Sequence, residues 1–261
     1  MTRRLAIALG AFVIWTAITV LLPLLTGAGQ AALTEIISRG FGWAWMLAGG
    51  FILAVVLWQG WRDVGLDRGA PLRAWALGWL PMIYILGAFG AAAAMGLPGP
   101  ITMGIVLMNC LFVGFSEELM FRGALLQALR HAMPVWPAVV ITSLAFGAIH
   151  SLNVFVTGDL GPALIQSCAA CLSGLFFIAY RLRCGSLWPP ILLHGLWDFA
   201  TFSLGVAAAT AQDGLLAPEI AATPDQGGLA ILFPVLLVLP NGLYGLWLMR
   251  NIGKTHASAT A

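Results

Sequence analysis

Charged residues are scarce in this chain. Only 8% of its 261 residues are Asp, Glu, Lys or Arg, whereas 61% are hydrophobic and the mean hydropathy is +0.95. An ordinary soluble domain has about 25% charged residues, so a soluble globular protein is excluded because too few polar side chains are present to cover a water-facing surface. The formal net charge of +2 also argues against a nucleic-acid-binding protein. Lipid is therefore the expected surroundings for most of the chain.

Cysteine is also rare, and the sequence shows neither an internal repeat nor a low-complexity segment. The four cysteines lie in or beside apolar runs, which is unlike the spaced cysteines of a disulfide-rich extracellular domain. Cys168 and Cys171 form a C-x-x-C sequence, but this sequence lies inside an apolar run. We interpret these two residues as helix-packing residues rather than as a redox or metal site.

Long apolar runs are what the chain does have. The hydrocarbon core of a bilayer requires about 20 mostly apolar residues per helix, and clusters of glycine and proline separate the runs. We expect an all-α integral membrane protein, in which about eight transmembrane helices form one bundle with an intramembrane polar cavity. A single domain over residues 1–261 follows. The predicted spans are residues 5–25, 41–61, 73–95, 101–130, 135–153, 161–181, 187–209 and 229–250.

The basic residues predict the orientation of the bundle. If the N-terminus is cytoplasmic, Arg39 is the one basic residue that falls outside, and Arg122 lies in a span towards the inner side. This is the positive-inside pattern, so we expect both termini in the cytoplasm and the chain in the plasma or inner cell membrane. The first apolar run exceeds the 7–15 residues of a signal sequence, which favours an uncleaved first helix. The basic residues on the inner side are Arg3, Arg4, Arg62, Arg68, Arg73, Arg130, Arg181, Arg183, Arg250 and Lys254.

Three acidic residues lie inside predicted spans, namely Glu117, Glu118 and Asp198. A charged side chain at the middle of a membrane costs about 2.5–3.5 kcal/mol or more on insertion scales. Such residues therefore need partners or a water-filled cavity. His150 and His194 also lie inside these spans. The five side chains are our candidates for a functional site.

The first of three motifs contains two adjacent glutamates. Glu118 and Arg122 are four residues apart on one helix face, with the acid first, which favours an ion pair. Glu117 points about 100° away from Glu118 around the helix. A structural salt bridge accounts for Glu118 and Arg122 but leaves Glu117 unexplained, so we assign Glu117 to function.

Two further motifs contain the histidines. Phe146 precedes His150 by one helical turn, and a histidine in this setting is by itself more often a hydrogen-bonding packing residue than a catalyst. His194 and Asp198 are four residues apart, so Asp198 is expected to hydrogen-bond His194 and fix its tautomer or charge. Two other polar residues of the spans are interpreted as interhelical hydrogen-bonding residues: Ser116 and Asn153.

Together the three motifs resemble those of the CAAX-protease and bacteriocin-processing (CPBP, or Abi) family of intramembrane proteases. That family carries Glu-Glu-x-x-x-Arg, Phe-x-x-x-His and His-x-x-x-Asn/Asp in this order on separate spans. The resemblance covers about residues 101–205 and implies a CAAX-protease-like catalytic core there. The matching residues are Glu117, Glu118, Arg122, Phe146, His150, His194 and Asp198.

The resemblance implies an intramembrane endopeptidase in which Glu117 and His150 activate a water for attack on a peptide carbonyl. His194 and Asp198 would stabilise the oxyanion. Elementary chemistry agrees with the first role, because a carboxylate removed from water is a stronger base than one in solution. The sequence contains no Gly-x-Ser-x-Gly motif. Supporting roles fall to Glu118, Arg122 and Phe146.

One residue departs from the prenyl-protein proteases of the family, which typically carry Asn in the last motif where this chain has Asp198. An ionised Asp cannot donate a hydrogen bond to an oxyanion. We therefore hypothesise that His194 is the donor and that Asp198 orients it or keeps it protonated.

Cofactor and partner expectations follow from the same residues. We favour a mechanism that requires no metal, although Glu117, His150, His194 and Asp198 would also suit zinc. The sequence has no His-Glu-x-x-His motif. The expected partners are the lipid bilayer and a membrane-embedded or lipidated peptide or protein, with no nucleic acid.

Two other functional classes remain open. A bacteriocin-immunity-type membrane protein would use the same fold and polar cluster to bind a partner. A transporter would also place Asp, Glu and His within the membrane. The clustering of the polar residues in three motifs and the lack of repeated halves weigh against the transporter.

Overall fold

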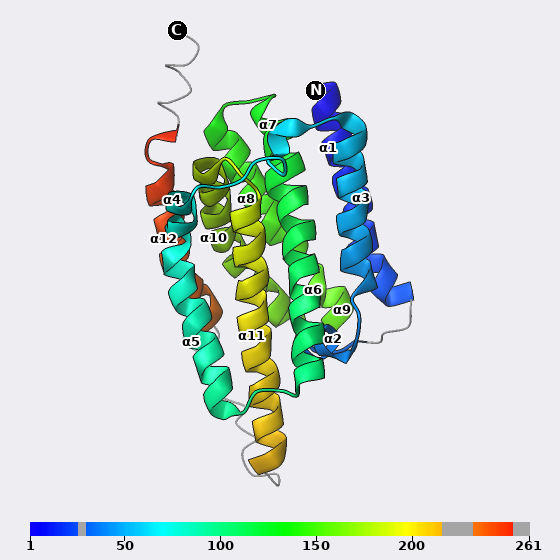
Figure 1. Cartoon of the computed structure of the whole chain (residues 1–261). Coiled ribbons are helices and arrows are strands. Elements are labelled where there is room, and N and C mark those ends of the chain that lie inside the picture. Colours follow the sequence, from blue (N-terminus) through cyan, green and yellow to red (C-terminus); the bar gives the residue numbers. More distant parts are fainter. Residues whose placement is uncertain (26–29, 216–231, 253–261) are drawn as a thin grey trace.

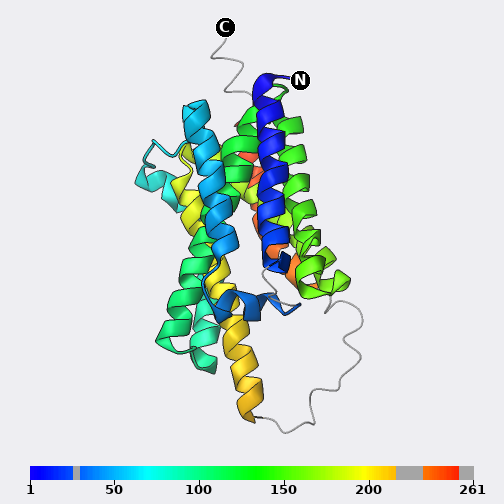
Figure 2. The same cartoon turned by 90° about the vertical axis from the view of Figure 1, so that its right-hand side faces the viewer.

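The computed structural model describes residues 1–25, 30–215 and 232–252 (Figures 1 and 2). Every regular element in these residues is helical, which confirms the expected all-α class. Six helical stretches are long and apolar enough to cross a membrane. They are α1 (Arg3–Leu25), α4–η2–α5 (Leu72–Met95), α6–η3–α7 (Pro100–Arg130), α8–α9 (Val135–Thr157), α10 (Leu160–Cys184) and the part of α11 (Trp188–Leu215) up to Ala211.

Two of the eight predicted spans differ in the structure. The second is a bent pair, α2 (Leu33–Arg39) and α3 (Trp43–Gln59), whose axes differ by 83°, and counting this pair gives seven spans. The last is α12 (Phe233–Met249), an apolar helix of 17 residues. The predicted start of that span at residue 229 and the basic Lys254 lie outside the described residues.

A buried asparagine stabilises the break between α2 and α3. The Asn109 side chain, which belongs to α6 (Pro100–Glu118), donates from Nδ2 to the carbonyl oxygens of Ile37 (2.9 Å) and Gly40 (2.8 Å). Its Oδ1 accepts from the Gly42 N–H at 2.8 Å. Non-helical backbone at membrane depth requires such internal partners. Asn109 is therefore the reason that the chain can turn sharply here inside an apolar protein.

Close contact between α6 and α11 forms the centre of the bundle, where the green and yellow helices run side by side (Figure 1). A Cβ atom added at Gly114 would lie 2.8 Å from both the Ile191 carbonyl oxygen and the Gly195 nitrogen, and one added at Gly195 would lie 3.2 Å from the Cys110 carbonyl oxygen. Small residues at facing positions let two backbones approach closely. The two helices that carry the acidic and histidine motifs are thereby brought into direct contact.

Hydrogen bonds from side-chain hydroxyls to backbone carbonyl oxygens join α8 (Val135–Ser151) to α10. The Ser143 hydroxyl donates to the Cys171 carbonyl oxygen at 2.6 Å, and the Ser167 hydroxyl donates to the Gly147 carbonyl oxygen at 2.7 Å. All four cysteines are free, and Cys171 packs against Gly147, in agreement with its interpretation as a packing residue. This contact fixes α8, which carries His150, against the rest of the bundle.

The first residue of α1 and the last residue of α12 lie at the same end of the bundle (Figure 1). At that end Asp63 of η1 (Arg62–Val64) accepts from Arg4 at 2.7 Å and lies 3.1 Å from His131 Nε2. Burial raises the pKa of Asp63, but the hydrogen bonds and charges of Arg4 and His131 outweigh burial and hold the pKa below its usual value. The cluster ties α1, η1 and the residues after α7 (Leu126–Arg130) together.

Candidate active site

The two adjacent glutamates are the last two residues of α6, and a wider type of helix follows them. Residues Leu119–Leu125 (η3) form a π-helix directly after Glu118; such segments are rare and frequently lie at functional sites. Glu118 is completely buried, whereas the Glu117 side chain remains 14% exposed. The two carboxylates therefore point in different directions, as their positions on a helix predict.

Glu118 and Arg122 form the expected ion pair in the interior. Glu118 Oε1 lies 3.1 Å from Arg122 Nη1, and neither side chain has any exposed surface. The Arg122 guanidinium also lies 4.0 Å from the centre of the Phe146 ring, a cation–π contact that is strongest when the pair is removed from water. Phe146 thus supports the cation from the neighbouring helix α8.

His194 is oriented by Glu118, and here the structure corrects the sequence-based assignment to Asp198. His194 Nδ1 lies 2.8 Å from Glu118 Oε1, where it donates to the carboxylate. Asp198 Oδ2 is instead 3.6 Å from the other ring nitrogen, Nε2, and makes no hydrogen bond to it. The close contact between α6 and α11 turns Nδ1 towards Glu118, while the Phe177 ring stacks on the imidazole at a centroid distance of 5.0 Å. The hydrogen bond therefore comes from Glu118 on the facing helix, while Asp198 contacts the ring as an ion pair.

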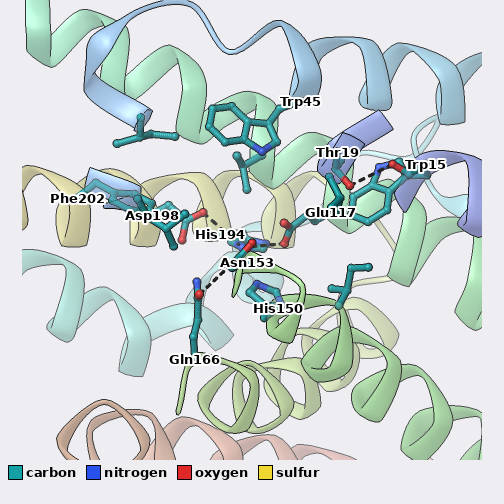
Figure 3. A pocket seen from close by; sticks show the side chains of 15 residues that line it. Trp15, Thr19, Trp45, Glu117, His150, Asn153, Gln166, His194, Asp198 and Phe202 are labelled. Carbon is teal, nitrogen blue, oxygen red and sulfur yellow. Dashed lines mark hydrogen bonds and ion pairs between the residues drawn. The ribbon is translucent and has the colours of Figure 1, made fainter. Parts of the chain in front are cut away.

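Nε2 of His194 is the nitrogen that faces the other acidic groups. It lies 3.7 Å from Glu117 Oε2 as well as 3.6 Å from Asp198 Oδ2, and Figure 3 shows both side chains converging on the ring. Coulomb attraction from neighbouring carboxylates stabilises positive charge on an imidazole. His194 thus occupies the centre of a buried acidic cluster.

His150 has a defined tautomer. Its Nδ1 lies 2.7 Å from the carbonyl oxygen of Phe146, one helical turn earlier. A carbonyl oxygen only accepts hydrogen bonds, so Nδ1 carries the proton and donates. In the neutral ring Nε2 is then an acceptor. The Phe-x-x-x-His spacing therefore leaves the basic Nε2 of His150 free to accept a hydrogen bond from another group.

A cavity of about 130 Å³ brings the predicted catalytic residues together inside the bundle (Figure 3). Its polar lining includes all four of the residues that the sequence assigns to catalysis: Glu117, His150, His194 and Asp198. Much of its apolar wall comes from α1 and from the bent pair α2–α3, with Trp15, Ile37 and Trp45 among the residues. Acidic and basic groups from three separate spans thus share one small, partly enclosed space.

The interpretation of Ser116 and Asn153 as interhelical hydrogen-bonding residues agrees with the structure. The Trp15 indole donates to the Ser116 hydroxyl at 2.8 Å and joins α1 to α6. Asn153 of α9 (Asn153–Thr157) donates from Nδ2 to Gln166 Oε1 on α10 at 2.8 Å. Gln166 lines the cavity, and sequence reasoning missed it. Its only signal is an uncharged amide within an apolar run.

The donor set does not have the arrangement of a metal site. Within residues 1–25, 30–215 and 232–252, no group of three or more His, Cys, Asp and Glu side chains is placed to hold a metal ion. The Nδ1 atoms of His150 and His194 are engaged by a carbonyl oxygen and a carboxylate respectively, which leaves Nε2 as the nitrogen of each ring that a metal could still reach. Chelation is the experiment that decides between the metal-free mechanism and the zinc alternative.

A comparison with known protein families gives a match to part of the chain. The family model of the type II CAAX prenyl endopeptidase Rce1-like proteins matches residues 99–200. This segment runs from the start of α6 into α11 and contains all three motifs. No curated protein and no solved structure was found to match the chain.

Proposed function

We propose, from the Rce1-like CAAX prenyl endopeptidase (CPBP) domain that residues 99–200 form in this multi-pass membrane protein, that the chain is an intramembrane endopeptidase. It hydrolyses a peptide bond of a membrane-embedded or lipidated peptide or protein. The observation that carries the proposal is the convergence of a buried carboxylate and a basic imidazole nitrogen on one intramembrane cavity.

Glu117 is the general base in this proposal. Its side chain lines the cavity and keeps 14% of its surface exposed, so the carboxylate can accept a hydrogen bond from a water there. His150 Nε2 accepts from the same water and orients it. As the water oxygen attacks the peptide carbonyl, Glu117 takes one proton and then delivers it to the leaving amine when the C–N bond breaks.

His194 is the proposed donor to the oxyanion. Its Nδ1 is engaged by Glu118, which leaves Nε2 directed towards Glu117 and Asp198. Donation from both nitrogens requires the charged ring, and the surrounding carboxylates stabilise that charge. Glu118 thereby holds the ring, and Arg122 balances the charge of Glu118 in a region without water.

The surroundings of the cavity favour an apolar substrate that arrives from the membrane. The cavity walls contributed by α1, α2 and α3 are largely hydrophobic, and the spans expose apolar side chains over their outer surfaces. We also propose that both termini are cytoplasmic and that the chain resides in the plasma or inner cell membrane, because basic residues such as Arg4, Arg62 and Arg130 are predicted on that side.

The test is cleavage of a panel of membrane-anchored and isoprenylated peptides by the purified, detergent-solubilised protein. Cleavage that is lost in Glu117→Gln and survives exhaustive chelation supports the proposal. Cleavage that chelation abolishes, together with stoichiometric zinc in the protein, contradicts the metal-free mechanism. If the folded protein cleaves none of the peptides, the peptidase assignment fails in favour of a partner-binding protein of the immunity type.

A further inference from the structure

Two uncharged amides line the cavity beside the proposed catalytic groups. Asn153 and Gln166 come from different helices, yet Nδ2 of Asn153 donates to Oε1 of Gln166 at 2.8 Å. In Figure 3 Asn153 lies between His150 and His194, and the bond to Gln166 is drawn beside them. The mechanism proposed above makes no use of this pair. Their position nevertheless gives them access to whatever occupies the cavity.

Each amide keeps an unused hydrogen-bonding group. The bond between them occupies one N–H of Asn153 and one lone-pair site of Gln166. Asn153 Oδ1 and Gln166 Nε2 have no hydrogen-bond partner among the described residues, and both residues line the cavity and are only partly buried. The first is an acceptor and the second a donor. The pair therefore presents the same two functions, acceptor and donor, that a peptide group requires.

The local fold holds the two amides in place. Gly158 ends α9 with a left-handed backbone (φ 78°), and Asp159 accepts from the Gly161 N–H at 3.0 Å to start α10. This tight turn folds α10 back beside α9, so that residues 13 positions apart in the sequence meet. The geometry does not depend on a long flexible loop.

A second cavity adjoins the first, and Gln166 lines both of them. This cavity, of about 120 Å³, lies towards α10 and α12 and shares His150, Gln166, His194 and Asp198 with the first. A substrate segment that extends from one cavity to the other therefore passes Gln166 directly beside the catalytic groups.

A peptide bond that is to be cleaved inside a membrane must leave its helix, and its neighbouring N–H and C=O groups then lose their partners. Unpaired backbone groups in an apolar medium cost several kcal/mol each. A site that receives an unwound segment consequently needs uncharged donors and acceptors. We propose that Asn153 and Gln166 together bind the backbone of one extended substrate residue next to the scissile bond, Asn153 Oδ1 accepting from its N–H and Gln166 Nε2 donating to its C=O. This inference rests on the proposed peptidase function.

The test uses cleavable peptides in which each amide beside the scissile bond is replaced in turn by an ester. An ester lacks the N–H that Asn153 would accept from. At one position the full-length protein should lose about tenfold in kcat/KM, the usual effect of one buried hydrogen bond. Asn153→Ala should lose about the same with the all-amide peptide and show no further loss with the ester. A wild-type preference for amide that Asn153→Ala fully retains at every position overturns the inference.

Gln166→Glu separates substrate binding from helix packing. A glutamate still accepts from Asn153 Nδ2 and keeps α9 tied to α10, but it replaces the free donor with an acceptor. We expect it to raise KM at least about tenfold, and its thermal stability is measured alongside because a carboxylate in this cavity is itself costly. Gln59→Glu, the same substitution at the end of α3 and outside the cavity lining, is the matched control. Wild-type KM in Gln166→Glu contradicts the inference.

Failure of the inference is distinguishable from failure of the peptidase function. If the wild-type protein cleaves peptides and neither variant changes the amide preference or KM, the inference alone is wrong. If the wild-type protein cleaves no peptide, binding of the all-amide and ester peptides to Glu117→Gln is measured in the same detergent. Amide-selective binding that Asn153→Ala abolishes supports the inference, and its absence overturns it.

Discussion

The ion pair between Glu118 and Arg122 should behave as one unit in stability measurements. With the charges 3.1 Å apart and both side chains fully buried, Coulomb attraction at an effective dielectric constant of about 20 amounts to about 5 kcal/mol. Much of this attraction is offset by the cost of removing both charges from water. Breaking such a pair from one side, by Glu118→Gln or Arg122→Met, is therefore expected to cost about 3–5 kcal/mol.

The double variant should be less destabilised than the sum of the two single variants by at least about 2 kcal/mol, since it leaves no unpaired buried charge. Reversible unfolding of the purified protein in mixed micelles, with SDS as denaturant, gives the free energies. The matched control is the ion pair of Glu35 and Arg39, which has the same i,i+4 spacing but exposed side chains. A double-mutant cycle on that pair should give a coupling of less than about 1 kcal/mol.

Additive losses for Glu118→Gln and Arg122→Met would refute this reasoning. So would a coupling as small as that of the exposed pair. Either result would mean that the buried charges are solvated or paired in another way, and the support that Glu118 gives to His194 would need a different explanation.

Three further predictions concern packing, the acidic cluster and pH. Gly195→Ala should separate α6 from α11, lowering stability by about 1–3 kcal/mol and cleavage with it, whereas Gly10→Ala, where an added Cβ meets nothing within 4 Å, should leave both intact in the same assays. Asp198→Asn should retain cleavage within about tenfold, while His194→Ala should lose at least about a hundredfold; equal losses would contradict the assignment of the oxyanion donor. Because the pKa of Asp63 is lowered in the folded state, its contribution is complete above its ordinary value of 3.8 and disappears as the pH falls through the folded-state pKa. Asp63→Asn should therefore lower the free energy of unfolding by less than about 1 kcal/mol at neutral pH and leave it unchanged at the acid extreme. A free energy of unfolding with the same pH dependence in Asp63→Asn and in the wild type would count against this.

Much of the fold follows from composition and spacing. Apolar runs of sufficient length identify most of the helices, and the glycine and proline clusters between them identify the connections. The bend at residues 40–42 is not visible in this way, because it depends on Asn109 of a distant helix supplying the missing backbone hydrogen bonds. The boundaries 101–205 for the catalytic core stay a prediction.

The residues of the candidate site are predictable because a charged side chain inside an apolar run is costly and therefore marks a site. Which of these residues contact one another is harder to predict from the sequence. A sequence shows only the neighbour four residues away on the same helix, which is correct for the ion pairs of Glu118 with Arg122 and of His194 with Asp198 but misses the hydrogen bond between His194 and Glu118. That hydrogen bond depends on how closely Gly114 and Gly195 allow two helices to approach.

The central claim is that Glu117 activates the attacking water, and the most direct measurement compares cleavage rates of two glutamate variants. Glu117→Gln keeps the shape of the side chain but removes its basicity, and we expect the rate on any cleaved peptide to fall at least about a hundredfold. Glu35→Gln, the same change on an exposed residue of α2, should cleave at the wild-type rate. Cleavage by folded Glu117→Gln within a few fold of wild type would contradict the claim.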